Sequence, residues 1–446
     1  MSFRMTLPAS FASASEYFEE VLTFLSEYQH LYKFPNTDIL IENVLDEIPA
    51  SSDDLDVYDD LFDLRNVTDE YFTNIFPKLD RLTPNCQDFT ADDRLELVID
   101  VPLSLKKKHE IVYLANELSN VCEQTRCNTI VDFGSGLGYL DQQLFATTHC
   151  QILGLECNEN HYVEAKKRQR KYHSESTEKV KYIKHTVTED SVPSLEELIR
   201  SKFPNTDNFC ITGLHACADL SVDAMNIFLR MPRARSLVIM PCCYHRLESR
   251  DGTFKNFPVS ECLKAVYTEL GGSGFLRVPF LRLATQPQVI TTSNIRDLVF
   301  NLLARAVLQL YGHKRNCKLK RRKRKGVRVR SVENDFEMYV QHVAAGFSLV
   351  PADADHASSA DAELEFSTDE LISMWSEISY IYTKRAAIFI LLQNYLQPMF
   401  ENVVLYDRLC YLRENGVESM YKRILNNSIS PRCLCLIAFK NNKQLQ

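Results

Sequence analysis

The chain lacks any apolar stretch long enough to cross a membrane. Its most apolar runs, such as residues 386–392 and 237–240, are far short of the roughly 20 residues that a transmembrane helix needs. The amino-terminal segment before Glu16 also lacks the continuous apolar region and cleavage site of a secretory signal. These absences predict a soluble globular protein that resides in the cytoplasm, the nucleus or both.

A dense cysteine framework and internal repeats are absent as well. The 14 cysteines are scattered through predicted strands and helices, which is typical of reduced, mostly buried thiols in a cytosolic or nuclear protein. A chain of 446 residues that is 45% hydrophobic can bury a large core and is too long for one compact unit. We therefore expect two or three domains.

Charge is distributed unevenly along the chain. The net charge is -8, and residues 46–69 are crowded with Asp and Glu, whereas residues 313–330 contain eleven Lys or Arg. Such a basic run can bind the phosphate backbone of RNA, serve as a nuclear import signal, or form a solvated loop without a partner. For the first interpretation, the candidate substrate-binding residues are Lys320, Arg321, Arg322, Lys323, Arg324 and Lys325.

Residues 129–140 read as a buried strand that runs into a glycine-rich turn. Asp132 lies near the end of the strand, and Gly134, Gly136 and Gly138 alternate through the turn before a helix that begins near residue 139. This spacing is tighter than the GxGxxG pattern of dinucleotide folds, and an acid precedes it. S-adenosylmethionine needs a backbone without Cβ atoms to lie against and a carboxylate for its ammonium group. The segment therefore predicts this cofactor, with contacts from Asp132 and the three glycines.

The next predicted strand, residues 152–156, ends in Glu156. A carboxylate at this distance beyond a glycine loop is placed to accept hydrogen bonds from both ribose hydroxyls of a nucleoside. The pair of motifs favours a methyl-donor cofactor over two alternatives. One is a nicotinamide dinucleotide, and the other is an ordinary strand–turn–helix unit with a surface glutamate.

The order of predicted elements divides the chain into four parts. Residues 1–104 read as a helical amino-terminal domain, with helices over 13–34, 57–64 and 71–82, and residues 105–257 as a core of alternating strands and helices. Residues 258–396 read as a mainly helical insertion with a flexible stretch at 351–362, and residues 397–446 as a segment that returns to the core sheet. We expect an α/β fold with a Rossmann-like, doubly wound parallel sheet. Its five core strands are predicted over residues 130–133, 152–156, 180–185, 209–214 and 237–240.

Chemically versatile side chains follow the fourth and fifth strands. In a doubly wound sheet these two tips flank the reactive atom of the ligand. Methyl transfer to a hydroxyl or a protonated nitrogen needs a base, and a neutral histidine suits that task. We take His245 as the first candidate base, His215 as the second and as a further cofactor contact, and Tyr244 as a third catalytic candidate. Cys217, Cys242 and Cys243 could instead join the histidines in a zinc site, but adjacent cysteines lack the usual CxxC spacing, so no metal is expected. Each of these residues can also be purely structural.

Seven segments carry a resemblance to a known family, that of methyltransferase-like protein 25 and a close relative once labelled as containing a ribosomal RNA adenine dimethylase domain. They are residues 107–110 (KKHE), 132–138 (DFGSGLG), 213–220 (GLHACADL), 240–247 (MPCCYHRL), 283–286 (LATQ), 407–412 (DRLCYL) and 430–440 (SPRCLCLIAFK). The resemblance implies a class I S-adenosylmethionine-dependent methyltransferase, with cofactor contacts at Asp132, Gly134, Gly136 and Glu156.

One departure argues against adenine dimethylation. Dimethylases similar to the old family label carry Asn-x-Pro-aromatic after the fourth strand, and residues 213–216 here read Gly-Leu-His-Ala. Paired cysteines followed by a histidine resemble instead a loop of a transfer-RNA ribose 2′-O-methylating family. RNA is therefore the leading substrate class, and a protein methyltransferase or a non-catalytic cofactor-binding partner protein are the alternatives.

Overall fold

The structure is a computed structural model that describes residues 4–5, 7–84, 89–272, 274, 276–286, 292–322, 334–352 and 365–440. It contains two compact units. The first unit comprises Met1–Thr23, Arg81–Gln288 and Gln397–Gln446, and the second comprises Phe24–Asp80 and Val289–Leu396. Residues 24–80 of the predicted amino-terminal domain therefore group with most of the predicted insertion. Residues 397–446 group with the core.

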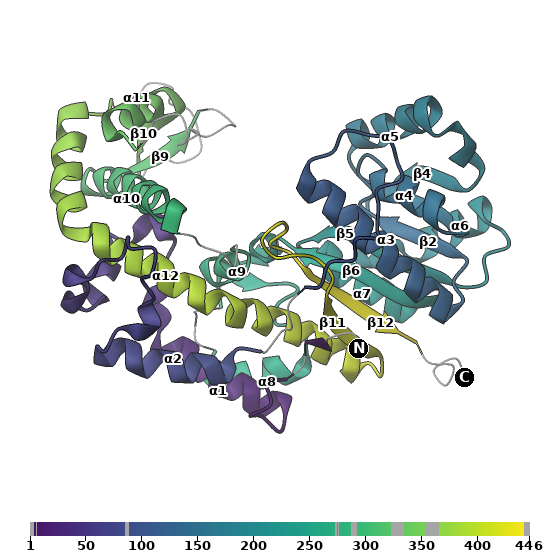
Figure 1. The fold of residues 1–446 in the computed structure, drawn as a ribbon, viewed down its shortest axis with the longest axis horizontal. Helices are drawn as coiled ribbons and strands as arrows, with labels where there is room; N and C mark the ends of the chain where they lie inside the picture. The colour runs from purple at the N-terminus through teal and green to yellow at the C-terminus, as the bar shows by residue number, and fades with distance from the viewer. Residues whose placement is uncertain are drawn as a thin grey trace. The chain divides into compact units, whose positions relative to one another are not determined.

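An eight-stranded sheet forms the centre of the first unit (Figure 1). Its order is β1-β11-β12-β6-β5-β2-β3-β4. The bounds are β1 Arg4–Met5, β2 Thr129–Phe133, β3 Gln151–Glu156, β4 Val180–Lys184, β5 Phe209–Cys217, β6 Ala234–Cys242, β11 Glu418–Arg423 and β12 Leu434–Phe439. Strands β2 to β6 pair in parallel, whereas β12 is antiparallel to β6 and to β11. This confirms the predicted doubly wound sheet and the return of the last strand to it.

The chain order reverses between β2 and β5. Strands β3 and β4 follow on one side of β2, and β5 and β6 lie on the other. Because crossovers between parallel strands are right-handed, this reversal puts helices on both faces of the sheet. In doubly wound sheets, ligands bind at the carboxyl ends of the two strands where the order reverses, which here are β2 and β5. All five residues of β2 are buried, with Ile130 and Val131 as β-branched core residues. The point at which the strand order reverses is therefore next to a fully buried strand.

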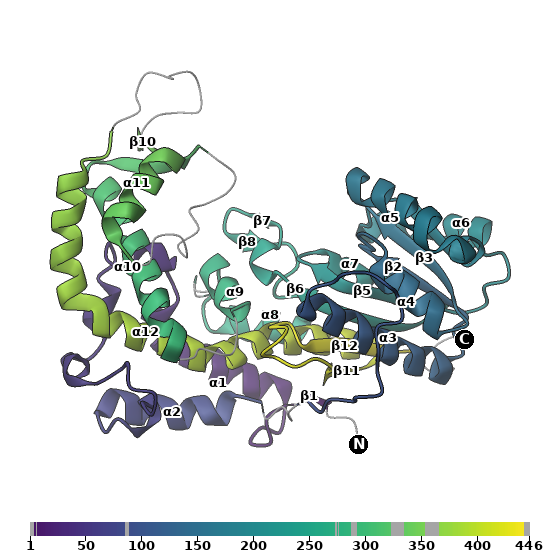
Figure 2. The same ribbon diagram turned by 45° about the horizontal axis from the view of Figure 1, so that its top comes forward.

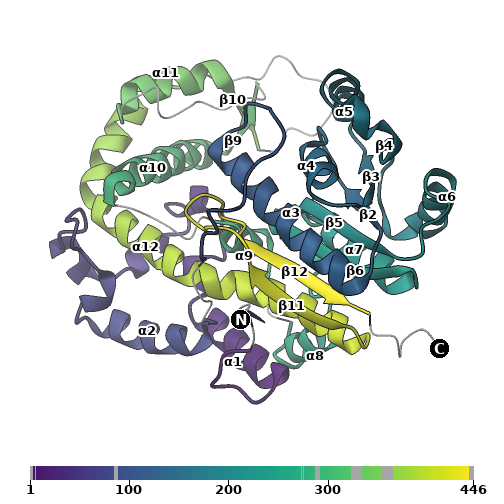
Figure 3. The ribbon, with the colours of Figure 1, turned by 45° about the vertical axis from the view of Figure 1, so that its right-hand side comes forward.

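Helices that connect or flank these strands complete the first unit. They are α3 Leu105–Thr125, α4 Tyr139–Thr147, α5 Glu159–Tyr172, α6 Val192–Lys202, α7 Leu220–Arg230, α8 Glu261–Glu269 and α9 Val278–Ala284, with a small hairpin of β7 Ser249–Arg250 and β8 Thr253–Phe254. The long helix α3 contacts α4, β5 and β6 (Figure 3). Ser104 caps its amino terminus by accepting a hydrogen bond from the Lys107 amide, so the helix begins where the sequence predicted.

The second unit is mainly helical (Figure 2). Its helices are most of α2 Glu70–Leu82, α10 Thr292–Lys314, α11 Phe336–Gly346 and the first part of α12 Thr368–Glu414, and it also contains a hairpin of β9 Cys317–Arg321 with β10 Phe347–Pro351. Helix α1 Ala14–Glu27 lies mostly in the first unit, and only its last turn belongs to the second. Helix α12 has 47 residues, with Pro398 inside it, and it contributes to both units. No helix of the described ranges combines the length and the apolar character that a bilayer span needs.

Some local predictions differ from the structure, and one lies largely outside the described residues. Residues 57–63 form turns rather than a helix, because the 3-10 turn there covers only Leu64–Asn66. Strands β5 and β6 run past their predicted ends to Cys217 and Cys242, so His215 lies on a strand and not in the loop beyond it. The predicted flexible stretch at 351–362 lies outside the described residues from position 353 onward.

Candidate active site

The glycine bend after β2 is the first component of the site. Gly134 and Gly136 have φ values of +82° and +59°, a region that only glycine adopts readily. The amides of Gly134 and Ser135 donate to the Leu155 carbonyl at 2.8 and 3.0 Å, which ties the bend to β3. A Cβ at Gly134 would meet nothing closer than 3.7 Å, and one at Gly136 would meet only a loop carbonyl at 4.0 Å. The open space at these two positions fits a ligand that lies against the backbone.

Gly138 has a packing role in addition to the cofactor contact that the sequence predicts for it. A Cβ at this position would lie 2.2 Å from the Tyr182 hydroxyl and 2.6 Å from the ring carbon that bears it. Tyr182 is buried, and its hydroxyl accepts a hydrogen bond from Gln142. The third glycine is therefore needed to pack α4 against β4, and the open space for a ligand is beside Gly134 and Gly136.

Two buried carboxyl groups lie beneath the bend. Asp132 is 2% exposed and Asp141, on α4, is fully buried. The Asp132 Oδ1 atom, both Asp141 carboxyl oxygens and the Ser135 hydroxyl have no hydrogen-bond partner among the described residues. Burial raises the pKa of Asp132 to about 7, and it also raises the pKa of Asp141. Two neighbouring buried acids relieve their repulsion when one is protonated and donates to the other, and the cationic group of a bound ligand would instead allow Asp132 to ionise.

Glu156 ends β3 and faces the same bend. It is 7% exposed, and its two carboxyl oxygens accept hydrogen bonds from the amides of Gly136 at 2.9 Å and Asn158 at 2.7 Å. The carboxylate thus fixes the glycine bend directly. The Oε1 atom also accepts a weak hydrogen bond from the Cys157 thiol at 3.7 Å, whereas Oε2 keeps a second lone pair that could accept from a ribose hydroxyl.

His215 is held by an acid from a distant helix. Its Nε2 lies 3.2 Å from the Glu110 Oε2 on α3, and the Ser430 hydroxyl donates to the other oxygen of Glu110 at 2.8 Å. Burial raises the Glu110 pKa, but the hydrogen bonds from His215 and Ser430 outweigh it and leave the pKa below its ordinary value. The His215 side chain is 40% exposed and Glu110 is almost wholly buried. This arrangement orients the imidazole.

His245 and Tyr244 follow β6 and differ sharply in exposure. His245 is half-buried, with its Nδ1 atom 3.3 Å from the Thr285 hydroxyl, and burial lowers its pKa, with help from the charges of Arg282 and Arg246. Tyr244 is 1% exposed, and its hydroxyl donates to Glu401 at 3.1 Å. Of these two candidates, the geometry gives His245 access to a substrate and gives Tyr244 the position of an anchor for the turn.

The candidate RNA contacts are in the second unit. Lys320 and Arg321 are exposed on β9, and Arg322 is the exposed residue that follows it. Lys323, Arg324 and Lys325 lie outside the described residues. The described cations therefore form a short basic edge at the end of a hairpin.

Sequence reasoning missed the residues that support the site from a distance. Asp141 lies in the first turn of α4, directly after the glycine motif. An acidic residue at a helix position that packs against the sheet is the signal that could have identified it. Gly154 is needed because a Cβ there would lie 2.8 Å from the Asp141 carboxylate and 2.9 Å from the Ser135 hydroxyl. Glu110 and Ser430 are 320 positions apart, and no local signal links them.

Comparison with known proteins agrees with this geometry. A family model described as a methyltransferase domain matches residues 106–250. The probable methyltransferase-like protein 25 of Mus musculus is 23% identical over 248 residues, which cover 53% of this chain and 38% of that protein. The Homo sapiens protein of the same name is 26% identical over 299 residues, with coverages of 63% and 44%. The chain thus spans less than half the length of these relatives.

Two solved structures show weaker likeness. A SAM-dependent methyltransferase from Agrobacterium tumefaciens is 12% identical with a TM-score of 0.23, covering 35% of this chain and 50% of that one. Human N-acetylserotonin methyltransferase in complex with SAM is 13% identical with a TM-score of 0.20, with coverages of 30% and 38%. From the sheet, the glycine bend and the family match, residues 106–250 form a class I S-adenosylmethionine-dependent methyltransferase domain. Within that class, the chain is similar to the two proteins named probable methyltransferase-like protein 25.

Proposed function

We propose that this chain transfers a methyl group from S-adenosylmethionine to RNA. The observation that carries the cofactor assignment is the buried Asp132 carboxyl group, whose Oδ1 atom has no partner among the described residues, beneath an open bend that lacks Cβ atoms at Gly134 and Gly136. Asp132 would accept hydrogen bonds from the ammonium group, and Glu156 would accept them from the ribose hydroxyls. When bound, the cofactor supplies an electrophilic methyl group, so the protein must align a nucleophile and remove its proton.

His245 is the proposed base. Its half-buried ring and lowered pKa keep the imidazole neutral at physiological pH, with the Thr285 hydroxyl as an orienting partner. His215 is the second candidate, since Glu110 orients it as a carboxylate orients the histidine of a catalytic triad. A ribose hydroxyl is the nucleophile that most needs such a base.

RNA is proposed as substrate because of the basic run. Residues 313–330 carry eleven Lys or Arg, and Lys320, Arg321 and Arg322 are exposed on the described part of it. Cations spaced this closely attract a phosphate backbone. A protein substrate, or binding of the cofactor without transfer, is the competing function, and one experiment separates all three.

The experiment is transfer of a radiolabelled methyl group by the purified full chain. Total RNA and total protein from cells that lack the protein serve as acceptors, because their target sites are unmodified. We expect label in RNA, and label only in protein would replace the substrate assignment. Calorimetric binding of the cofactor with label in neither fraction would support the non-catalytic alternative.

Variants then test the base. We expect His245→Gln to lower the transfer rate by about a hundredfold or more while cofactor affinity is unchanged. Thr285→Val is the matched control for the hydrogen bond to the ring and should cost far less. If His245→Gln turns over normally and His215→Gln does not, the base is His215.

The basic edge is tested by charge removal. Replacing residues 320–322 with Gln should weaken RNA binding and reduce the slope of log affinity against log salt by about 2, because three cations release fewer counterions. The control replaces Arg94, Arg250 and Lys264, three exposed cations of the first unit, and should leave the slope unchanged. Equal slopes for both variants would remove the support that the basic run gives to RNA.

A further inference from the structure

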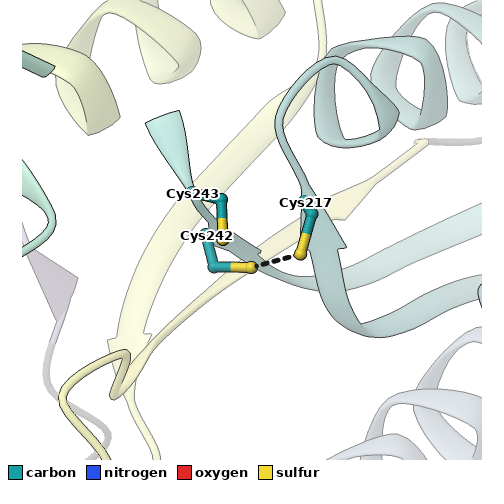
Figure 4. A group of neighbouring side chains, drawn as sticks. All are labelled: Cys217, Cys242 and Cys243. Carbon is teal, nitrogen blue, oxygen red and sulfur yellow. Dashed lines mark hydrogen bonds between the residues drawn. The ribbon is translucent and has the colours of Figure 1, made fainter. Parts of the chain in front are cut away.

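Three cysteines gather where β5 and β6 end (Figure 4). Cys217 is the last residue of β5, Cys242 is the last residue of β6, and Cys243 follows it. One sulfur from each lies within 4.8 Å of the other two, and this is the only such group of three His, Cys, Asp or Glu side chains in the described part of the chain. The strand register pairs Cys217 directly with Cys242, and their Sγ atoms are 2.8 Å apart.

The backbone at Cys243 explains how adjacent cysteines can share one site. Successive residues of a strand point to opposite faces, so Cys243 in an extended conformation would turn its sulfur away from Cys242. Cys243 instead has φ of +54°, a left-handed conformation that costs a non-glycine residue about 1 kcal/mol or more. A hydrogen bond from the Arg246 amide to the Cys243 carbonyl at 2.9 Å closes the turn. The strained residue thus brings the third sulfur back to the other two.

The cluster is also accessible from outside the protein. Cys242 is buried, whereas Cys217 and Cys243 are half-buried, so an ion can reach the sulfurs from solvent.

We propose that Cys217, Cys242 and Cys243 bind a zinc ion through their three sulfurs. Thiolates select soft and borderline ions, and three protein ligands leave the fourth tetrahedral position open to water or a substrate. With zinc–sulfur bonds of about 2.3 Å, two sulfurs on one ion lie about 3.8 Å apart. The sulfurs of Cys217 and Cys242 must therefore separate by about 1 Å, which a small side-chain rotation provides.

The competing outcome is a disulfide between Cys217 and Cys242. A disulfide would bring the sulfurs to about 2.05 Å and would leave Cys243 without a role in the cluster. Zinc uses all three sulfurs, so the contribution of Cys243 distinguishes the two. The zinc proposal rests on the cluster alone and does not depend on the methylated substrate.

Metal content of the full chain tests the proposal. The protein is prepared without a histidine tag, under a thiol reductant, loaded with zinc chloride, dialysed and assayed by plasma mass spectrometry. We expect one zinc per chain in the wild type and in the control Cys262→Ser, a half-buried cysteine outside the cluster. Cys217→Ser, Cys242→Ser and Cys243→Ser should each lower zinc affinity at least about tenfold.

A second measurement needs no variant. Cobalt(II) in place of zinc should give the wild type an intense sulfur-to-cobalt charge-transfer absorption, which reports thiolate ligands even if a serine variant fails to fold. The proposal is overturned if the wild type takes up neither ion, if Cys243→Ser keeps full zinc affinity, or if mass spectrometry finds the Cys217–Cys242 disulfide under the same reducing conditions.

Discussion

Alanine at each glycine of the bend should separate cofactor binding from folding. Gly136 and Gly138 both have positive φ, so an alanine at either position costs about 1 to 2 kcal/mol for the backbone alone. Beyond that shared cost, the two sites differ in what the new Cβ meets. At Gly136 it meets open space, and at Gly138 it meets the Tyr182 side chain.

The magnitudes follow from these contacts. A Cβ placed 2.2 Å from the Tyr182 hydroxyl must displace a buried ring, and overpacking of this kind costs about 1 to 3 kcal/mol. With the backbone cost added, Gly138→Ala should lose about 2 to 5 kcal/mol of stability. Gly136→Ala should lose only the backbone cost, but its methyl group occupies the space proposed for the cofactor. We expect its cofactor affinity to fall at least about tenfold, or about 1.4 kcal/mol.

Gly252 provides the matched control. Its φ is +79°, and a Cβ there would meet nothing within 4 Å. Gly252→Ala therefore carries the same backbone cost in the turn between β7 and β8, away from the bend. Urea unfolding measures the stability of all three variants, and titration calorimetry with S-adenosylmethionine measures affinity. Equal affinity in Gly136→Ala and Gly252→Ala would refute a cofactor at the bend, and equal stability in Gly138→Ala and Gly252→Ala would refute the packing role of Gly138.

Two further predictions concern buried charges. Burial raises the pKa of Asp132 to about 7 in the folded protein. The unfolded chain therefore releases this proton at lower pH than the folded protein does, and the free energy of unfolding falls as pH rises from about 4 to 7. Urea unfolding of the ligand-free protein at several pH values should show this loss of stability. Asp132→Asn should flatten the dependence of stability on pH and should also weaken cofactor binding. A variant with the same pH profile as the wild type would contradict the raised pKa of Asp132. Glu401→Gln should cost about 3 kcal/mol in urea unfolding, because it leaves the buried Arg432 guanidinium without its carboxylate. A loss below about 1 kcal/mol would show that the pair is dispensable.

The parts of the site that the sequence could predict each lie at the end of one strand or in the turn that follows it. Asp132, the glycine bend and Glu156 lie at the ends of β2 and β3, and alternation of strands and helices was enough to bring them together. The partition of the chain was harder, because residues 24–80 and 289–396 join one compact unit across a long separation in sequence. Neither composition nor periodicity reports such a pairing.

The spacing of residues in the sequence also could not predict the separate role of each residue in and near the bend. The motif gives Gly134, Gly136 and Gly138 the same status, yet only the position of Tyr182 on β4 shows that the third is a packing glycine. Asp141 is similar, because its burial depends on Gly154 of the neighbouring strand. Contacts between elements decide these roles, and a one-dimensional pattern does not contain them.

The segment between β11 and β12 supports the surroundings of both histidines. Ser430 donates to Glu110, which orients His215 on β5. Two residues later, Arg432 forms an ion pair with Glu401, the acceptor of the Tyr244 hydroxyl. One short segment between β11 and β12 thus supports the ends of both β5 and β6.

The same segment also reaches the partner of the proposed base. Arg432 donates to the carbonyls of Ala284 at 3.0 Å and Gln286 at 2.8 Å, on either side of Thr285, whose hydroxyl contacts His245. The segments that resemble the methyltransferase-like protein 25 family outside residues 106–250 include 283–286 and 430–440, which meet at these contacts. The supports of the β5 and β6 ends therefore extend beyond the matched domain. Residues 106–250 alone would keep the glycine bend, Glu156 and the contact of Glu110 with His215, but would lose Ser430, which holds Glu110, and Thr285, which contacts His245.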